Sequence, residues 1–249
     1  MVALPAGQFM MGQTEAEKAE LIRQVGEQDY KKYFARELPR HSVTLAAFSM
    51  GKYPVTQAQY QAIMGNNPSK FKGNSRPVEK VSWYEAMEFC DRLSKKLDQP
   101  YTLPSEAQWE YACRSGTTTP FHFGETITTD LANYDGRYTF ASGPKGVYRE
   151  ETTDVGSFLP NGFGFYDMHG NVWEWCLDHW HDNYERAPTD GSAWVTGGDS
   201  SRRMLRGGSW FYNPRLCRCA YRGTVNLVSG SFSIGFRVVS VPPRALGRE

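Results

Sequence analysis

The sequence predicts an α+β protein with few regular elements, in which short strands and helices are separated by long packed loops. The first half of the chain contains stretches of apolar residues at helical spacing. The region beyond Gly116 is instead rich in Gly, Asn, Asp, Ser and aromatic residues, which form turns too readily for long helices. Tryptophan side chains there can supply the apolar area that aliphatic residues supply elsewhere.

The N-terminal fifty residues predict a strand, a helix and a second strand. Residues 2–11 are mostly apolar and favour a short strand. Residues 14–37 form a charged stretch with three apolar residues at helical spacing, which indicates a helix. Residues 41–53 show the apolar pattern of a strand.

Three further helices follow. Thr56 is a suitable N-cap for a short helix over residues 57–64. Residues 82–97 place their apolar side chains on one face and end in two lysines, which complement the helix dipole. Residues 105–108, Ser-Glu-Ala-Gln, form a capping-box pattern and predict a helix that Gly116 ends.

Length and charge limit the classes of function. The 249 residues contain no Pro- or Ser-rich linker, so we expect one domain over residues 1–249. A net charge of +1 with mixed signs disfavours nucleic acid and anionic membranes as partners. The N-terminus has neither a signal peptide nor a long apolar run, which predicts a cytoplasmic protein without membrane insertion.

Cysteine and histidine spacing gives no metal motif. The five cysteines form an odd set without a Cys-x-x-Cys pair, which argues against a zinc site or a disulfide framework and favours reduced, buried thiols. His179 and His181 are close in sequence, and we expect them in a solvated loop. The cysteines are Cys90, Cys113, Cys176, Cys217 and Cys219.

Several motifs occur in the order that one family shows. They are residues 77–83 (PVEKVSW), 103–112 (LPSEAQWEYA), 161–164 (NGFG), 170–175 (GNVWEW), 205–210 (LRGGSW) and 235–237 (GFR). In these motifs the chain resembles the formylglycine-generating enzyme and sulfatase-modifying-factor superfamily over nearly its whole length. The resemblance implies a variant of the C-type lectin fold, with short strands and helices that frame extended loops.

The resemblance also implies a structural calcium site. Carboxylate and carbonyl oxygens suit this hard cation, although the same carboxylates could instead accept hydrogen bonds from loop amides without a metal. A second family calcium site, near Asn133 and Tyr134, lacks its carboxylate because Val147 occupies that position. The positions that match the first site are Asp167, Gly170, Val172 and Glu174.

The family's catalytic pair is incomplete. Its enzymes use two cysteines, five positions apart, whose thiolates bind copper. Here the second position is Cys217, but the first is Tyr212, so we expect neither catalytic residues nor copper. Two alternatives stay open: an oxidase of the formylglycine-generating type that uses Cys217, and a metal site formed by Cys217 and Cys219 if both lie on one extended strand.

Residues 211–233, the variable segment, lie between two family-like motifs. Every residue type in the segment can be encoded by a codon ending in cytosine, and Lys, Glu, Gln, Met and Trp are absent. In this respect the chain resembles the variable proteins of diversity-generating retroelements, in which adenines of Asn-type codons are randomised. The resemblance divides the segment into framework and candidate positions. The framework positions are Pro214, Arg215, Arg218, Ala220 and Arg222. The candidate positions are Phe211, Tyr212, Asn213, Leu216, Cys219, Tyr221, Gly223, Thr224, Val225, Asn226, Ser229, Ser231, Phe232 and Ser233.

The sequence therefore predicts a diversified ligand-binding protein, in which an exposed face formed by the variable segment binds a protein or another macromolecule. A rigid scaffold suits this function because loop side chains can be exchanged without loss of the fold. A third possibility is a structural or regulatory module that uses the fold for protein–protein contacts alone.

Overall fold

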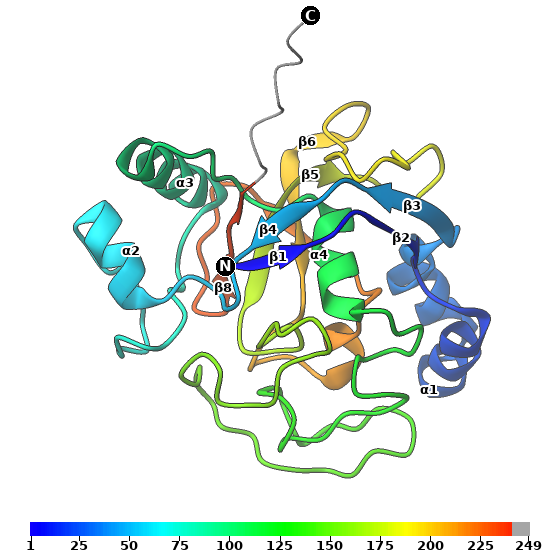
Figure 1. Cartoon of the computed structure of the whole chain (residues 1–249). Coiled ribbons are helices and arrows are strands. Elements are labelled where there is room, and N and C mark those ends of the chain that lie inside the picture. The colour runs from blue at the N-terminus through cyan, green and yellow to red at the C-terminus, as the bar shows by residue number, and fades with distance from the viewer. Residues whose placement is uncertain (241–249) are drawn as a thin grey trace, which may run out of the picture.

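The computed structural model describes residues 1–240. In these residues, four α-helices and three small sheets alternate with long loops, which confirms the α+β class (Figure 1). The longest stretch without helix or strand lies between residues 115 and 172, where turn-forming residues were expected to dominate. Within the described residues, no helix is both long and apolar enough to span a membrane.

The four helices begin where the sequence predicts. Each has a capping box, in which the N-cap hydroxyl and the side chain three residues later exchange hydrogen bonds with the backbone. The predicted helix over residues 14–37 kinks at Gly26. It is shorter than expected because it ends at Tyr33, and a 3-10 helix follows at Ala35–Glu37. The helices are α1 (Glu15–Tyr33), α2 (Gln57–Met64), α3 (Trp83–Leu97) and α4 (Glu106–Arg114).

Each of the two predicted N-terminal strands is two strands in the structure. The first is interrupted at Pro5, which has no N–H to donate to a neighbouring strand. As a result β1 (Val2–Leu4) pairs with β4 (Phe48–Met50), while β2 (Gly7–Met11) pairs with β3 (His41–Leu45) in a separate sheet. A further strand, β9 (Val239–Ser240), also pairs with β4.

A four-stranded sheet with the order β7-β6-β5-β8 lies at the centre of the molecule (Figure 1). The strands are β5 (Trp173–Trp180), β6 (Asp199–Arg206), β7 (Gly223–Asn226) and β8 (Ile234–Gly235). At eight residues each, β5 and β6 are longer than the short strands expected in this region. Most side chains of β5 lie in the core, which favours a continuous strand there. The first three residues of β6 are exposed, so its length depends on pairing with β5 and β7.

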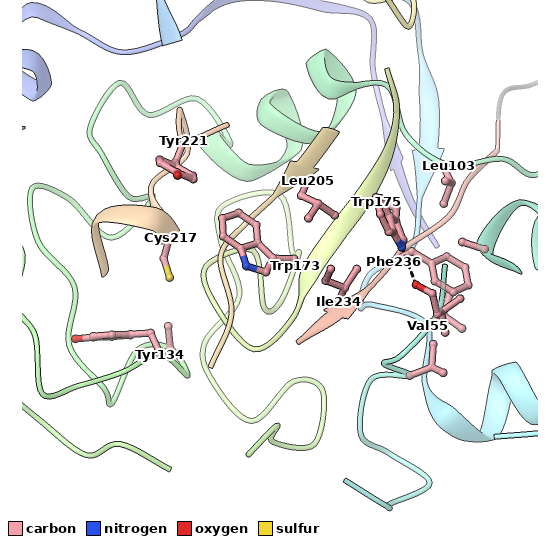
Figure 2. Packing of buried hydrophobic residues seen from close by; sticks show 14 of the residues in the cluster. Val55, Leu103, Tyr134, Trp173, Trp175, Leu205, Cys217, Tyr221, Ile234 and Phe236 are labelled. Atoms are coloured by element: carbon pink, nitrogen blue, oxygen red, sulfur yellow. Dashed lines mark hydrogen bonds between the residues drawn. The ribbon is translucent and has the colours of Figure 1, made fainter. Parts of the chain in front are cut away.

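Tryptophan and arginine side chains fill much of the core. The Trp175 ring is fully buried, and its indole Nε1 donates to the Val81 carbonyl at 2.9 Å (Figure 2). Four arginines, at positions 206, 218, 222 and 237, are also fully buried. A buried charge is tolerated only when it is paired, so these arginines must have acidic partners.

Candidate binding surface

The variable segment follows the edge of the four-stranded sheet. After a loop it forms a 3-10 helix at Pro214–Cys217, then the edge strand β7, and it rejoins the sheet at β8. Strand pairing fixes the segment at β7, which pairs with β6, and directly after its end at β8, which pairs with β5. The segment therefore has a defined path over the scaffold.

Arg218 joins the segment to the N-terminal helical region. Its guanidinium donates to both carboxylate oxygens of Glu37, at 2.6 and 2.9 Å, and to Glu17 at 3.2 Å. All three side chains are buried, and burial raises the pKa of Glu17 despite the neighbouring positive charge of Arg218. A framework position thus provides an ion pair with two other segments of the chain.

Arg222 joins the segment to α4 in the same way. Its Nε and Nη2 atoms donate to the two oxygens of Glu106, at 2.8 and 3.0 Å, and Arg206 donates to the same carboxylate at 3.1 Å. Burial would raise the pKa of Glu106, but the two guanidinium groups outweigh it and lower that pKa. Pro214 and Ala220 are buried too, whereas Arg215 is half-buried. Framework positions therefore lie mostly under the surface.

Eight candidate positions line one hollow on this edge of the sheet. The hollow has a volume of about 410 Å³. Trp173 contributes to its wall and contacts Tyr212 and Tyr221 with ring centroids 5.5 and 5.8 Å apart. The candidate positions in the lining are Tyr212, Leu216, Tyr221, Gly223, Thr224, Val225, Ser231 and Ser233. The lining residues outside the segment are Arg36, Trp173, Arg202, Leu205 and Ile234.

Those five scaffold residues were missed by the sequence analysis. Trp173 belongs to the GNVWEW motif, which the resemblance associated only with calcium. Arg202 lies in β6 opposite Asn226 of β7, a pairing that depends on register and not on a local pattern. A binding surface read from the variable segment alone is therefore incomplete.

The remaining candidate positions lie outside the hollow. Phe211 is 46% exposed and packs against Phe232 and Trp210, with ring centroids 5.6 and 5.3 Å apart. Asn226 is exposed, and Asn213 caps the 3-10 helix by accepting a hydrogen bond from a backbone N–H. Ser229 is half-buried. Most of the segment's candidate side chains thus reach solvent or the hollow.

The expectation of an exposed side chain is wrong at three candidate positions, because Tyr221, Ser233 and Cys219 are buried. Tyr221 and Ser233 still border the hollow, unlike Cys219. The Cys219 side chain is fully buried and contacts Cys113 at 3.4 Å between sulfur atoms. The alternative of a metal site formed by Cys217 and Cys219 also fails. Cys217 ends a 3-10 helix, so the two residues are not on one extended strand with side chains on the same side.

The residues at the family's two copper-binding positions, Tyr212 and Cys217, do not fit copper. Cys217 is fully buried among apolar side chains and points toward Tyr134 (Figure 2). Burial raises the pKa of the Cys217 thiol to about 12, which disfavours the thiolate. Tyr212, at the first position, offers a phenol that packs on Trp173 and no second sulfur. One buried thiol is a poor ligand set for copper.

The expected calcium ligands have mixed surroundings. Asp167 is half-buried, and its buried Oδ1 atom has no hydrogen-bond partner among the described residues, which leaves one oxygen suited to a cation. Both oxygens of Glu174 are occupied instead, by Arg237 at 2.6 Å and by the Trp109 indole at 2.7 Å. Gly170 and Val172 lie in the loop that leads from Asp167 into β5. Asp167 therefore fits a calcium ligand better than Glu174 does.

The two neighbouring histidines are not in a solvated loop, contrary to expectation. His179 belongs to β5, and His181 follows directly after that strand. The His181 ring is buried and stacks on Trp194 with a centroid separation of 3.5 Å. The prediction failed because β5 is longer than the sequence indicated.

Comparison with known proteins identifies the family of this architecture. Residues 1–241 match the model of the sulfatase-modifying factor enzyme 1-like domain. The formylglycine-generating enzyme of Mus musculus is 31% identical over 192 residues, which are 74% of this chain and 49% of that protein. The chaperone protein LppX of Paenibacillus barcinonensis is also 31% identical, over 80% of this chain and 81% of its own length.

Two solved structures have the same fold along nearly their whole length. PvdO from Pseudomonas aeruginosa has a TM-score of 0.78 at 33% identity and covers 96% of this chain, which covers 92% of PvdO. Treponema denticola variable protein 1 has a TM-score of 0.78 at 27% identity, with 97% of this chain and 95% of that one covered. The chain has the fold of these proteins, the C-type lectin variant that its motifs imply.

Proposed function

Because the chain belongs to the sulfatase-modifying factor enzyme 1-like family, we propose that it combines the family's scaffold with a diversified ligand-binding surface on residues 211–233. The observation that carries this proposal is the hollow, which eight candidate positions line together. Four of the five framework positions are buried, and none of the five lines the hollow. Side chains can be exchanged in such an arrangement without disturbing the ion pairs that hold the backbone.

The side chains at the surface suit a macromolecular ligand. Tyr212, Tyr221 and Trp173 present aromatic rings in the hollow, and Phe211 lies beside it. Large aromatic residues dominate recognition surfaces because they contribute much contact area at little conformational cost. We propose a protein or a comparable macromolecule as the ligand, and the likeness to Treponema denticola variable protein 1 supports a variable surface.

An oxidase that uses Cys217 is the second candidate, because that cysteine occupies the family's second catalytic position. It is weaker because Tyr212 replaces the partner thiol and burial raises the pKa of Cys217. The genomic sequence next to this gene separates the two functions. We expect a reverse transcriptase gene and a second copy of the 211–233 coding segment that differs mainly at adenines. If neither is present and the protein oxidises a cysteine-containing peptide with copper, the oxidase is the correct assignment.

The segment should tolerate simultaneous replacement of its accessible side chains. We expect a variant with Phe211→Ser, Tyr212→Ser, Asn226→Ser and Val228→Ser, all exposed positions, to lose less than about 2 kcal/mol of unfolding free energy, since surface substitutions cost about 0.5 kcal/mol each. Urea unfolding measures this loss. The control is Trp210→Ala, where a buried ring costs about 3–5 kcal/mol. A quadruple variant less stable than this control would place the segment in the core and contradict the proposal.

Calcium is proposed as a structural ion held through Asp167. We expect added calcium to raise the melting temperature of the wild-type chain. The unpartnered Asp167 Oδ1 would bind the ion in the folded state alone, which stabilises that state. Asp167→Asn should abolish this rise, while the exposed Asp190→Asn should retain it. Scanning calorimetry with EDTA or calcium tests the idea, and an equal rise in both variants would exclude Asp167 as the ligand.

A further inference from the structure

Three side chains with metal-binding atoms meet in the core beneath the variable segment. Cys113 comes from α4, His169 from the loop before β5, and Cys219 from the variable segment itself. One ligand atom from each residue lies within 4.8 Å of the others, and all three side chains are buried. The sulfur atoms are 3.4 Å apart, and the Cys113 sulfur is 3.8 Å from His169 Nε2.

The His169 imidazole is oriented as in most metal-bound histidines. His169 Nδ1 lies 2.7 Å from the Cys217 carbonyl oxygen, which can only accept a hydrogen bond, so the ring proton is on Nδ1. The lone pair is therefore on Nε2, the nitrogen nearer to Cys113. It accepts a hydrogen bond from the His122 backbone N–H at 3.2 Å, which metal binding would replace. Metal-bound histidines commonly donate their other nitrogen to a backbone carbonyl in this way.

A second imidazole side chain lies beside the cluster. The His122 ring stacks on His169 with centroids 4.8 Å apart. Both His122 ring nitrogens are buried, and neither has a hydrogen-bond partner among the described residues. Buried polar atoms without partners are rare in folded proteins, which indicates that a group able to bind them belongs here.

We propose that Cys113, His169 and Cys219 bind a zinc ion, with His122 as the adjacent fourth donor. Two thiolates with imidazole suit zinc, which prefers sulfur and nitrogen ligands in tetrahedral sites. Binding displaces the two thiol protons into solvent and so strengthens as the pH rises. The absence of a Cys-x-x-Cys motif does not exclude the site, since the ligands come from segments 56 and 106 residues apart.

Such an ion would act as a cross-link below the binding surface. It would connect α4 and the loop before β5 to Cys219, next to the framework residue Arg218. This site differs from the family's copper-binding position at Cys217, whose sulfur is not a member of the cluster. Its role would be to hold the variable segment in place at Cys219, whatever side chains the segment carries elsewhere.

Metal analysis of the full-length protein tests the site. We expect one zinc ion per chain by mass spectrometry after purification with zinc present. After chelation and cobalt addition, we expect a thiolate-to-cobalt charge-transfer band with the intensity of two sulfur ligands. Cys219→Ala and His169→Ala should lose the metal. Cys90→Ala and Cys217→Ala remove buried thiols outside the cluster and should keep it.

The wild-type protein decides the question even if a variant fails to fold. Titration of thiols in denaturant should find five free cysteines once the metal is removed. Three free thiols with no reducing agent would reveal a Cys113–Cys219 disulfide and overturn the proposal. Five free thiols without bound zinc or a cobalt band would overturn it as well. Neither result would affect the test of the ligand-binding surface.

Discussion

Arg218→Ala is expected to lower the free energy of unfolding by about 3–5 kcal/mol, the usual cost of breaking a buried ion pair. Removal of the guanidinium would leave Glu37 and Glu17 in the core without their partner. The stability of the variant should recover partly on mild acidification, because protonation neutralises carboxylates that have lost their positive partner. Urea unfolding followed by tryptophan fluorescence at two pH values measures both effects.

The matched control lies three residues earlier in the same segment. Arg215→Ala removes a half-buried arginine that contacts Gln24 at 3.5 Å and forms no ion pair within the described residues. Its cost should stay below about 1 kcal/mol, as for other substitutions near the surface. Equal losses in the two variants would show that Arg218 does not anchor the segment.

Gly170→Ala is expected to cost about 2–5 kcal/mol. Gly170 has a φ of 89°, a left-handed conformation that costs other residues about 1–2 kcal/mol. An added methyl group would also collide with the backbone carbonyl of Asn133, which cannot move away as a flexible side chain could. Overpacking of this kind costs about 1–3 kcal/mol more. Thermal unfolding would measure the total.

Gly164→Ala separates the two contributions. Its φ of 86° is nearly the same, but an added Cβ would meet no atom within 4 Å. The control should therefore show the conformational cost alone, about 1–2 kcal/mol. If both glycines give the same loss, steric contact with Asn133 is not important and the loop has room to shift.

Local sequence signals located the helices because the information lies within a few residues. Thr56 and Ser105, for example, cap their helices through side chains in the same turn. Strand limits were less well predicted. Pairing decides them, so the division of residues 2–11 between two sheets and the full length of β5 depended on distant partners.

The candidate surface was predicted in outline only. The residue types present and absent indicated the segment, and most of its candidate side chains do reach solvent or the hollow. Composition could not distinguish Cys219, whose side chain is fully buried, from exposed candidates such as Phe211 and Tyr212. Nor could it find Trp173 and Arg202, because they join the hollow through strand register.

The buried arginines also bear on how the chain reaches its native state. Arg218 is bonded to a residue 181 positions earlier, and Arg222 to one 116 positions earlier. Contacts of such high contact order form late, because the entropy of closing long loops must be overcome first. We therefore expect the variable segment to be among the last parts to become ordered, so that sequence changes at its accessible positions alter the unfolding rate more than the folding rate.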